Sequence, residues 1–270
     1  MSAAAATIGA FVRRDFTIAR SYRFQFVLET AGTLASLVLF FYLSKLIDGT
    51  SGSVHDQLPE GYFAFAVVGV ALLRLVHAGA AASPTRLRQE QTAGTLEAVA
   101  STPARPWVTA IAGGTYELLR ALVAVTVTIV LAIAVFGLHV DSSVPGVLAA
   151  IGGLLAFALL LAGAGVAIAS LTTLVKQTTA VLGLAVTGIA LLGGFYFPLD
   201  VLPDGLRRIA QALPFSWAAD VVRDGLLSAR VDGAKLAGLA LVAIALLPLA
   251  LWSFEAAARR ARATGTLTHY

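Results

Sequence analysis

Six apolar stretches long enough to cross a lipid bilayer constrain this sequence more than any other feature. A transmembrane helix needs about 20 consecutive, mostly apolar residues to cross about 30 Å of hydrocarbon. The six stretches run over residues 24–47, 61–83, 107–138, 144–175, 178–197 and 236–254. Only 13% of the 270 residues are charged, whereas a soluble domain carries about 25%. The sequence therefore predicts an all-α integral membrane protein with a single transmembrane domain over residues 1–270.

The distribution of Lys and Arg predicts how the six spans are oriented. If the N-terminus lies inside, the inner segments carry eleven Lys and Arg but only four Asp and Glu. The outer segments then carry six basic and nine acidic residues. Because Lys and Arg accumulate in cytoplasmic loops, we expect both termini in the cytoplasm. The Ala-, Gly- and Val-rich composition is typical of GC-rich bacterial genomes, which points to a bacterial cytoplasmic membrane.

The sequence lacks the patterns of the common enzymatic sites. It has no cysteine, which excludes disulfides and thiolate nucleophiles. Its four histidines are scattered and do not have the spacing of a metal site. No glycine-rich stretch carries the Lys of a phosphate-binding loop. We therefore expect no catalytic residue, metal or cofactor in this chain, and no nucleic-acid partner.

An amphipathic helix is predicted before the first span, over residues 7–22. Ile8, Phe11, Val12 and Phe16 fall on one helical face, whereas most of the arginines take the other and Asp15 breaks the pattern. Such a helix lies in the membrane interface. A basic leader that only fixes the orientation is the alternative.

Residues 198–230 are too polar to span a membrane and too apolar for an ordinary loop. Pro198, Pro203 and Pro214 divide this stretch into short pieces, two of which have a helical pattern. We expect re-entrant helices on the outer side, because backbone at that depth is tolerated where other protein buries it. A plain extracellular loop is the alternative.

Residues 86–106 form a polar, helix-prone segment between the second and third spans. Leu96, Val99 and Ala100 share one helical face, and the helix must end by Thr102 because Pro103 follows. A helix of two turns is not stable alone in water, so it must pack on another surface. The other cytoplasmic segments are too small to offer one. We therefore expect a partner protein in the cytoplasm.

Several of these features together resemble the type-2 ABC exporter permeases, a family of drug, lipid and polysaccharide exporters. The pattern Glu-x-x-x-Gly-Thr-Leu-Glu, followed by Thr-Pro, occupies residues 90–103, and Phe-x-Phe-Pro with two Leu-Pro pairs occupies residues 195–214. The N-terminal amphipathic helix and the six-span layout resemble the same family. Each motif is degenerate alone, but they occur in the expected order over nearly the whole chain.

The resemblance implies a partner and a docking site. The segment between the second and third spans would be a coupling helix that docks on a separate ABC ATP-binding subunit, which holds ATP and Mg. Residues 7–22 would be the interfacial elbow helix, and two permease copies would dimerise. The docking residues implied are Glu90, Gly94, Thr95, Leu96, Glu97, Val99 and Thr102, with a second contact near Lys176 and Gln177. Either glutamate taken singly is equally explained as a solvated helix charge.

The ionisable residues inside the predicted spans include Glu29, Arg74, His77, Glu117 and Arg120. A charged side chain at mid-bilayer costs about 2.5–3.5 kcal/mol on insertion scales, so such residues are paired or functional. At about 1.5 Å per residue, Arg74 and Glu117 lie at the same depth, and Glu29 lies level with His77. We expect a polar relay with the pairs Glu29–His77 and Arg74–Glu117. Static pairing that only neutralises buried charge predicts the same contacts.

The predicted function is that of a permease subunit of an ATP-driven exporter, without an ATPase site of its own. It would move an amphipathic drug-like or lipid-linked substrate outward by alternating access. Candidate cavity-facing residues are Phe63, Phe65, Phe195 and Tyr196, for which ordinary packing is the alternative. A polysaccharide exporter of the same family and a stand-alone channel or scramblase are the alternative functions. The sequence does not distinguish a homodimer from a heterodimer.

Overall fold

The computed structural model describes residues 3–21, 23–48, 61–92, 106–175 and 178–263, which form helices joined by short connections. Within these ranges there is no β-strand. The helices are α1 (Ala3–Ser21), α2 (Arg23–Asp48), α4 (Gly61–Thr92), α6 (Pro106–Phe136), α7 (Val144–Val175), α8 (Thr178–Leu192), the 3-10 helix η1 (Leu199–Val201), α9 (Asp204–Ala212), α10 (Pro214–Leu227) and α11 (Gly233–Ala263).

Five of these helices are long and apolar enough to cross a membrane. They correspond to five of the six predicted spans and cover Phe24–Ile47, Gly61–Gln89, Ile111–Phe136, Val144–Leu171 and Gly233–Arg260. The remaining predicted span, residues 178–197, is a shorter apolar helix, α8, of 15 residues. The described residues therefore contain five candidate spans, and the six-span layout stays a prediction.

Three helices end five or more residues away from the predicted position. Helix α8 ends at Leu192 because Gly194 adopts a left-handed conformation (φ +65°), which turns the chain although the apolar pattern continues. Helix α4 continues through Pro84 to Thr92 instead of ending at Ser83. Helix α11 runs on to Ala263, because the Ala- and Arg-rich residues after Phe254 favour helix.

Helix α4 is the centre of the bundle. In its most apolar window 72% of the residues are buried, against 11% in α2 and 17% in α11. It packs against α6 and α7, and α7 packs in turn along α11 and against α10. A Cβ atom on Gly165 of α7 would lie only 2.5 Å from the carbonyl oxygen of Gly79 of α4. Small residues therefore let α4 and α7 approach closely, as is common between membrane helices.

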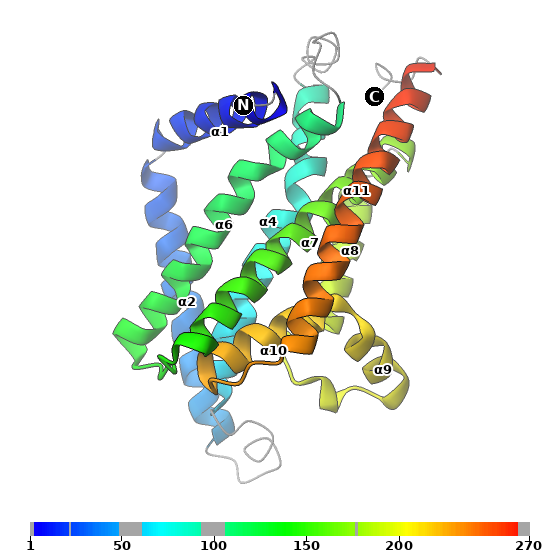
Figure 1. The fold of residues 1–270 in the computed structure, drawn as a ribbon. Coiled ribbons are helices and arrows are strands. Elements are labelled where there is room, and N and C mark those ends of the chain that lie inside the picture. Colours follow the sequence, from blue (N-terminus) through cyan, green and yellow to red (C-terminus); the bar gives the residue numbers. More distant parts are fainter. Residues whose placement is uncertain (1–2, 22, 49–60, 93–105, 176–177, 264–270) are drawn as a thin grey trace.

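The two ends of the bundle carry different elements. Helix α1 lies across the end where α6 begins and where α4 and α11 end, whereas α9 and α10 lie at the opposite end (Figure 1). The three prolines of residues 198–230 act as predicted, since Pro198 precedes η1, Pro203 precedes α9 and Pro214 begins α10. Only α10 of this segment is well buried. The depth of these helices in a membrane stays a prediction.

Candidate functional site

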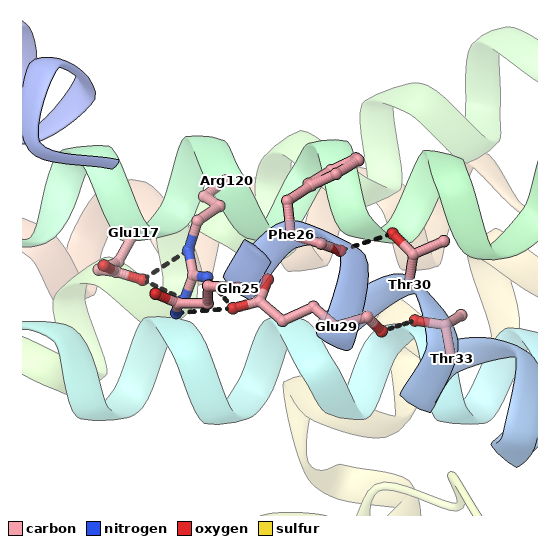
Figure 2. A network of polar contacts seen from close by, with 7 residues as sticks. All are labelled: Gln25, Phe26, Glu29, Thr30, Thr33, Glu117 and Arg120. Atoms are coloured by element: carbon pink, nitrogen blue, oxygen red, sulfur yellow. Dashed lines mark hydrogen bonds and ion pairs between the residues drawn. The ribbon is translucent and has the colours of Figure 1, made fainter. Parts of the chain in front are cut away.

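Arg120 of α6 forms ion pairs with two carboxylates inside the bundle. Its Nη2 lies 2.8 Å from Oε2 of Glu117, one turn earlier on the same helix, and its Nη1 lies 2.5 Å from Oε1 of Glu29 on α2. Arg120 Nε donates a further hydrogen bond to Glu117 at 3.1 Å, and Gln25 donates one to Glu29 at 2.9 Å. Figure 2 shows the guanidinium between the two carboxylates. We call Glu29, Glu117 and Arg120 the charge triad.

The charge triad connects α2 to the rest of the bundle. Helix α2 is the least buried of the spanning helices, and its few contacts are with α4 and α6. An unpaired charge in the hydrocarbon region is costly, whereas a guanidinium can bind two carboxylates with its five donors. The triad therefore pairs half-exposed charges and fixes one face of α2 against α6.

The pairs expected from the sequence are not those that the structure contains. Arg120, not Arg74, binds Glu117, and the same arginine binds Glu29. The Nδ1 atom of His77 lies 2.9 Å from the carbonyl oxygen of Leu73 on its own helix. Arg74 forms no ion pair within 4 Å with the described residues. Counting along each helix estimates depth, but it carries no information on which side of its helix each residue finds its neighbour.

A cavity of about 1720 Å³ lies beside the charge triad. Helices α1, α2, α4 and α6 line it, and all five residues of the predicted relay contribute to its wall, Arg74 and His77 included. The rest of the lining is mixed: apolar side chains such as Phe26, Val27 and Val123 alternate with polar and charged ones, among them Arg13, Asp15 and Arg20. Among the described residues, no three His, Asp or Glu side chains lie close enough together to hold a metal ion. The cavity is thus an amphipathic chamber with paired charges in its wall.

Asp15 connects α1 to this cavity. Its carboxylate lies 3.0 Å from Nε of Arg14 and 3.9 Å from Nη2 of Arg86 on α4, and its side chain is only 12% exposed. Asp15 therefore faces the bundle, although it breaks the amphipathic pattern of the sequence. Phe16 and Ile18 of α1 are instead more than half exposed. Helix α1 is held by an ion pair as well as by apolar contacts.

The four aromatic residues expected at a substrate cavity do not line this one. Phe65 and Phe195 are buried in the core, where Phe195 packs against Phe157 with 6.1 Å between the ring centroids. Phe63 belongs to a cluster with Phe41 and Phe136. Packing therefore accounts for these three residues.

Tyr196 differs from the other three aromatic residues. It is 41% exposed. Its backbone carbonyl oxygen accepts a hydrogen bond of 3.4 Å from the Tyr62 hydroxyl. Its side chain is thus accessible from outside the chain, and its role in substrate contact stays a prediction.

The sequence analysis missed a partly buried arginine on α10. The guanidinium of Arg223 donates from Nη2 to the carbonyl oxygens of Gly194, Phe195 and Phe65, at 2.9, 3.4 and 3.5 Å. Its Cζ also lies 3.7 Å from the centroid of the Phe65 ring. Burial lowers the pKa of Arg223 to about 10, so the group stays charged at neutral pH. Arg223 ties the chain after α8 to both α4 and α10.

A signal for Arg223 was present in the sequence, but it was weak. Arg223 is four residues after Ala219 and seven after Ser216, which are both buried, so it falls on the inner face of α10. Gly69 of α4 leaves room for this contact, because a Cβ there would lie 1.8 Å from the Phe195 carbonyl oxygen.

The expected docking residues lie mostly outside the described part of the chain. Glu90 is near the end of α4, but its side chain is not described. Gly94, Thr95, Leu96, Glu97, Val99, Thr102, Lys176 and Gln177 lie outside the described residues. Their role in docking stays a prediction.

Comparison with known protein families gives one match. The family model described as "ABC-2 type transporter" matches residues 7–227, from α1 to the end of α10. A search of curated proteins found no match. The matched region contains the charge triad, the cavity, the segment between α4 and α6, and Arg223.

Proposed function

Since the chain belongs to the ABC-2 type transporter family and is a membrane-embedded ABC permease subunit, we propose that it exports an amphipathic substrate with energy from a separate ATP-binding subunit. The match over residues 7–227 carries this proposal. The sequence contains no phosphate-binding loop, so the energy of ATP must come from a partner. The substrate is a drug-like or lipid-linked molecule, and it moves outward between two permease copies in a bacterial cytoplasmic membrane.

The arrangement of the helices supports coupling through the segment that joins α4 to α6. Helix α4 ends and α6 begins at the same end of the bundle as α1 (Figure 1). Helix α4 is the most buried helix, and α6 carries Arg120 and Glu117. A force applied to this segment therefore acts on the centre of the bundle and, through Arg120, on α2. Closure of the ATP-binding subunits would move these helices together and switch access from the inner to the outer side.

Copurification from the native host tests this function. The full-length chain is purified in mild detergent, and stoichiometric partners are identified by mass spectrometry. We expect a soluble ABC ATPase that is lost when Leu96 and Val99 are both changed to Asp. Ala98→Asp is the matched control, because it adds a charge to the same segment on the other expected helical face.

One outcome would contradict the proposed function, and a second would contradict only the docking face. Recovery of a folded, monodisperse chain without any ATPase would favour the stand-alone channel or scramblase. An ATPase that is retained by the Leu96→Asp/Val99→Asp variant would leave the permease role intact but exclude this docking face.

A further inference from the structure

Among the described residues, the carboxylates around the cavity all have arginine partners, but not all of the arginines have a carboxylate partner. Each carboxylate in its wall has an arginine partner: Glu29 and Glu117 bind Arg120, and Asp15 lies beside Arg14 and Arg86. Two further arginines of α1, Arg13 and Arg20, also line the cavity. Neither forms an ion pair within 4 Å with a described carboxylate. The rim formed by α1 is therefore positively charged.

Part of the wall below this rim is formed by apolar side chains that are also exposed to the outside of the chain. Phe26 and Val27 of α2 and Leu119 and Val123 of α6 all line the cavity. They are also 61%, 58%, 48% and 58% exposed, respectively. Helices α2 and α6 make few contacts with each other, so the cavity is bordered by apolar side chains that are accessible from the side. In a bilayer these side chains would contact acyl chains.

The size of the cavity limits what fills it. Its volume of about 1720 Å³ exceeds the range of about 300–1,000 Å³ that is usual for drug-sized ligands. Water alone would be a poor occupant beside four large apolar side chains. The occupant must combine an anionic group for the rim with long apolar chains for the walls.

From this combination we propose that the cavity binds an anionic phospholipid of the surrounding leaflet. Its phosphate and headgroup contact Arg13 and Arg20 of α1, and its acyl chains lie between α2 and α6. An interfacial helix carrying arginines at the level of the headgroups is the geometry in which such contacts form. The bound lipid fills the space between α1 and the bundle. It is distinct from the transported substrate, and the proposal does not depend on the direction or the energy source of transport.

Competition between two lipids tests the proposal with the full-length chain. The protein is purified in detergent, mixed with equal amounts of phosphatidylglycerol and phosphatidylcholine, and analysed by native mass spectrometry. We expect the wild-type chain to retain phosphatidylglycerol preferentially. Each of Arg13→Gln and Arg20→Gln should weaken its binding about fivefold, the effect of one basic residue near an anionic headgroup.

Arg14→Gln is the matched control for these variants. It removes the same charge from the same helix, but Arg14 does not line the cavity. We expect Arg14→Gln to reduce binding clearly less than Arg13→Gln. Equal losses in the two variants, or equal retention of both lipids by the wild-type chain, would overturn the proposal. All three arginines are exposed, so the variants should remain folded, which gel filtration verifies.

Photo-crosslinking locates the lipid independently of the arginine variants. One equivalent of phosphatidylglycerol with a photoreactive group on an acyl chain is added to the chain in detergent, and labelled peptides are identified. We expect labelling at Phe26, Val27 and Val123. Leu241 and Ile244 of α11 are equally exposed apolar residues that do not line the cavity, and equal labelling there would contradict a defined site.

Discussion

Replacing Arg120 by Gln should destabilise the chain more than replacing any other charged residue of the predicted relay. The change removes the cation that binds both Glu29 and Glu117 and leaves two carboxylates close together in an apolar bundle. Gln keeps much of the side chain's volume and can still donate a hydrogen bond. The loss is therefore mainly electrostatic.

The magnitude follows from the burial of the charge triad. Removing one partner of a fully buried ion pair costs about 3–5 kcal/mol. The side chains of Arg120, Glu29 and Glu117 are 39%, 41% and 40% exposed, respectively, so we scale this cost down to about 2 kcal/mol. For a chain of about this size, 1 kcal/mol corresponds to a shift of about 2–4 °C in Tm. We expect Arg120→Gln to lower the Tm by about 4–8 °C.

Thermal unfolding of the purified chain in detergent measures this shift. Arg74→Gln is the matched control, because Arg74 lines the same cavity without an ion pair to a described residue. It should lower the Tm by less than half as much. Combining Arg120→Gln with Glu29→Gln and Glu117→Gln should restore most of the loss, since no charge is then left unpaired. A larger effect of Arg74→Gln, or no recovery in the triple variant, would refute the reasoning.

Five further substitutions, two of them controls, have expected effects on thermal unfolding. Arg223→Met should lower the free energy of unfolding by about 3 kcal/mol, because it leaves buried carbonyl groups without their charged donor. The control Arg208→Met, at an exposed position of α9, should lower it by less than about 0.5 kcal/mol. Gly69→Ala should destabilise the chain by about 2–3 kcal/mol, because the new Cβ would clash with a backbone carbonyl oxygen. The control Gly188→Ala places its Cβ where no atom lies within 4 Å, and it should stabilise α8 by about 0.5–1 kcal/mol. Lys235→Gln removes a half-exposed ion pair of 2.7 Å and should cost at most about 1 kcal/mol.

Much of the fold was predictable from the sequence because bilayer-length apolarity is a local property. Helix α7 has the predicted bounds, 144–175, and α2 begins and ends within one residue of the predicted span. The prolines that divide residues 198–230 also act locally, through the missing N–H and the fixed φ angle. The errors at the ends of α8 and α4 arose because the effect of a single Gly or Pro on a helix was misjudged from the apolar pattern around it. Gly194 ends α8, whereas Pro84 does not end α4.

The candidate site was only partly predictable. The sequence identified the five ionisable residues of the predicted relay, and the structure brings all five to one cavity. It did not identify Asp15 as a partner of α4, or Arg223 as a link between α10 and the chain after α8, because in each case that partner does not lie on the residue's own helix. Both residues owe their role to neighbours that are distant in the sequence.

The sequence by itself determined that the chain is a bundle of membrane helices and that it belongs to a family of permeases. It also identified the ionisable residues of the predicted spans that are costly to place in a bilayer, namely Glu29, Arg74, His77, Glu117 and Arg120. Only the tertiary structure decided which charges pair. The depth of a residue follows from counting along one helix, but the rotation of that helix and its distance from the next depend on how all the helices pack. That packing places Arg120 between two carboxylates and leaves Arg74 in the wall of the cavity.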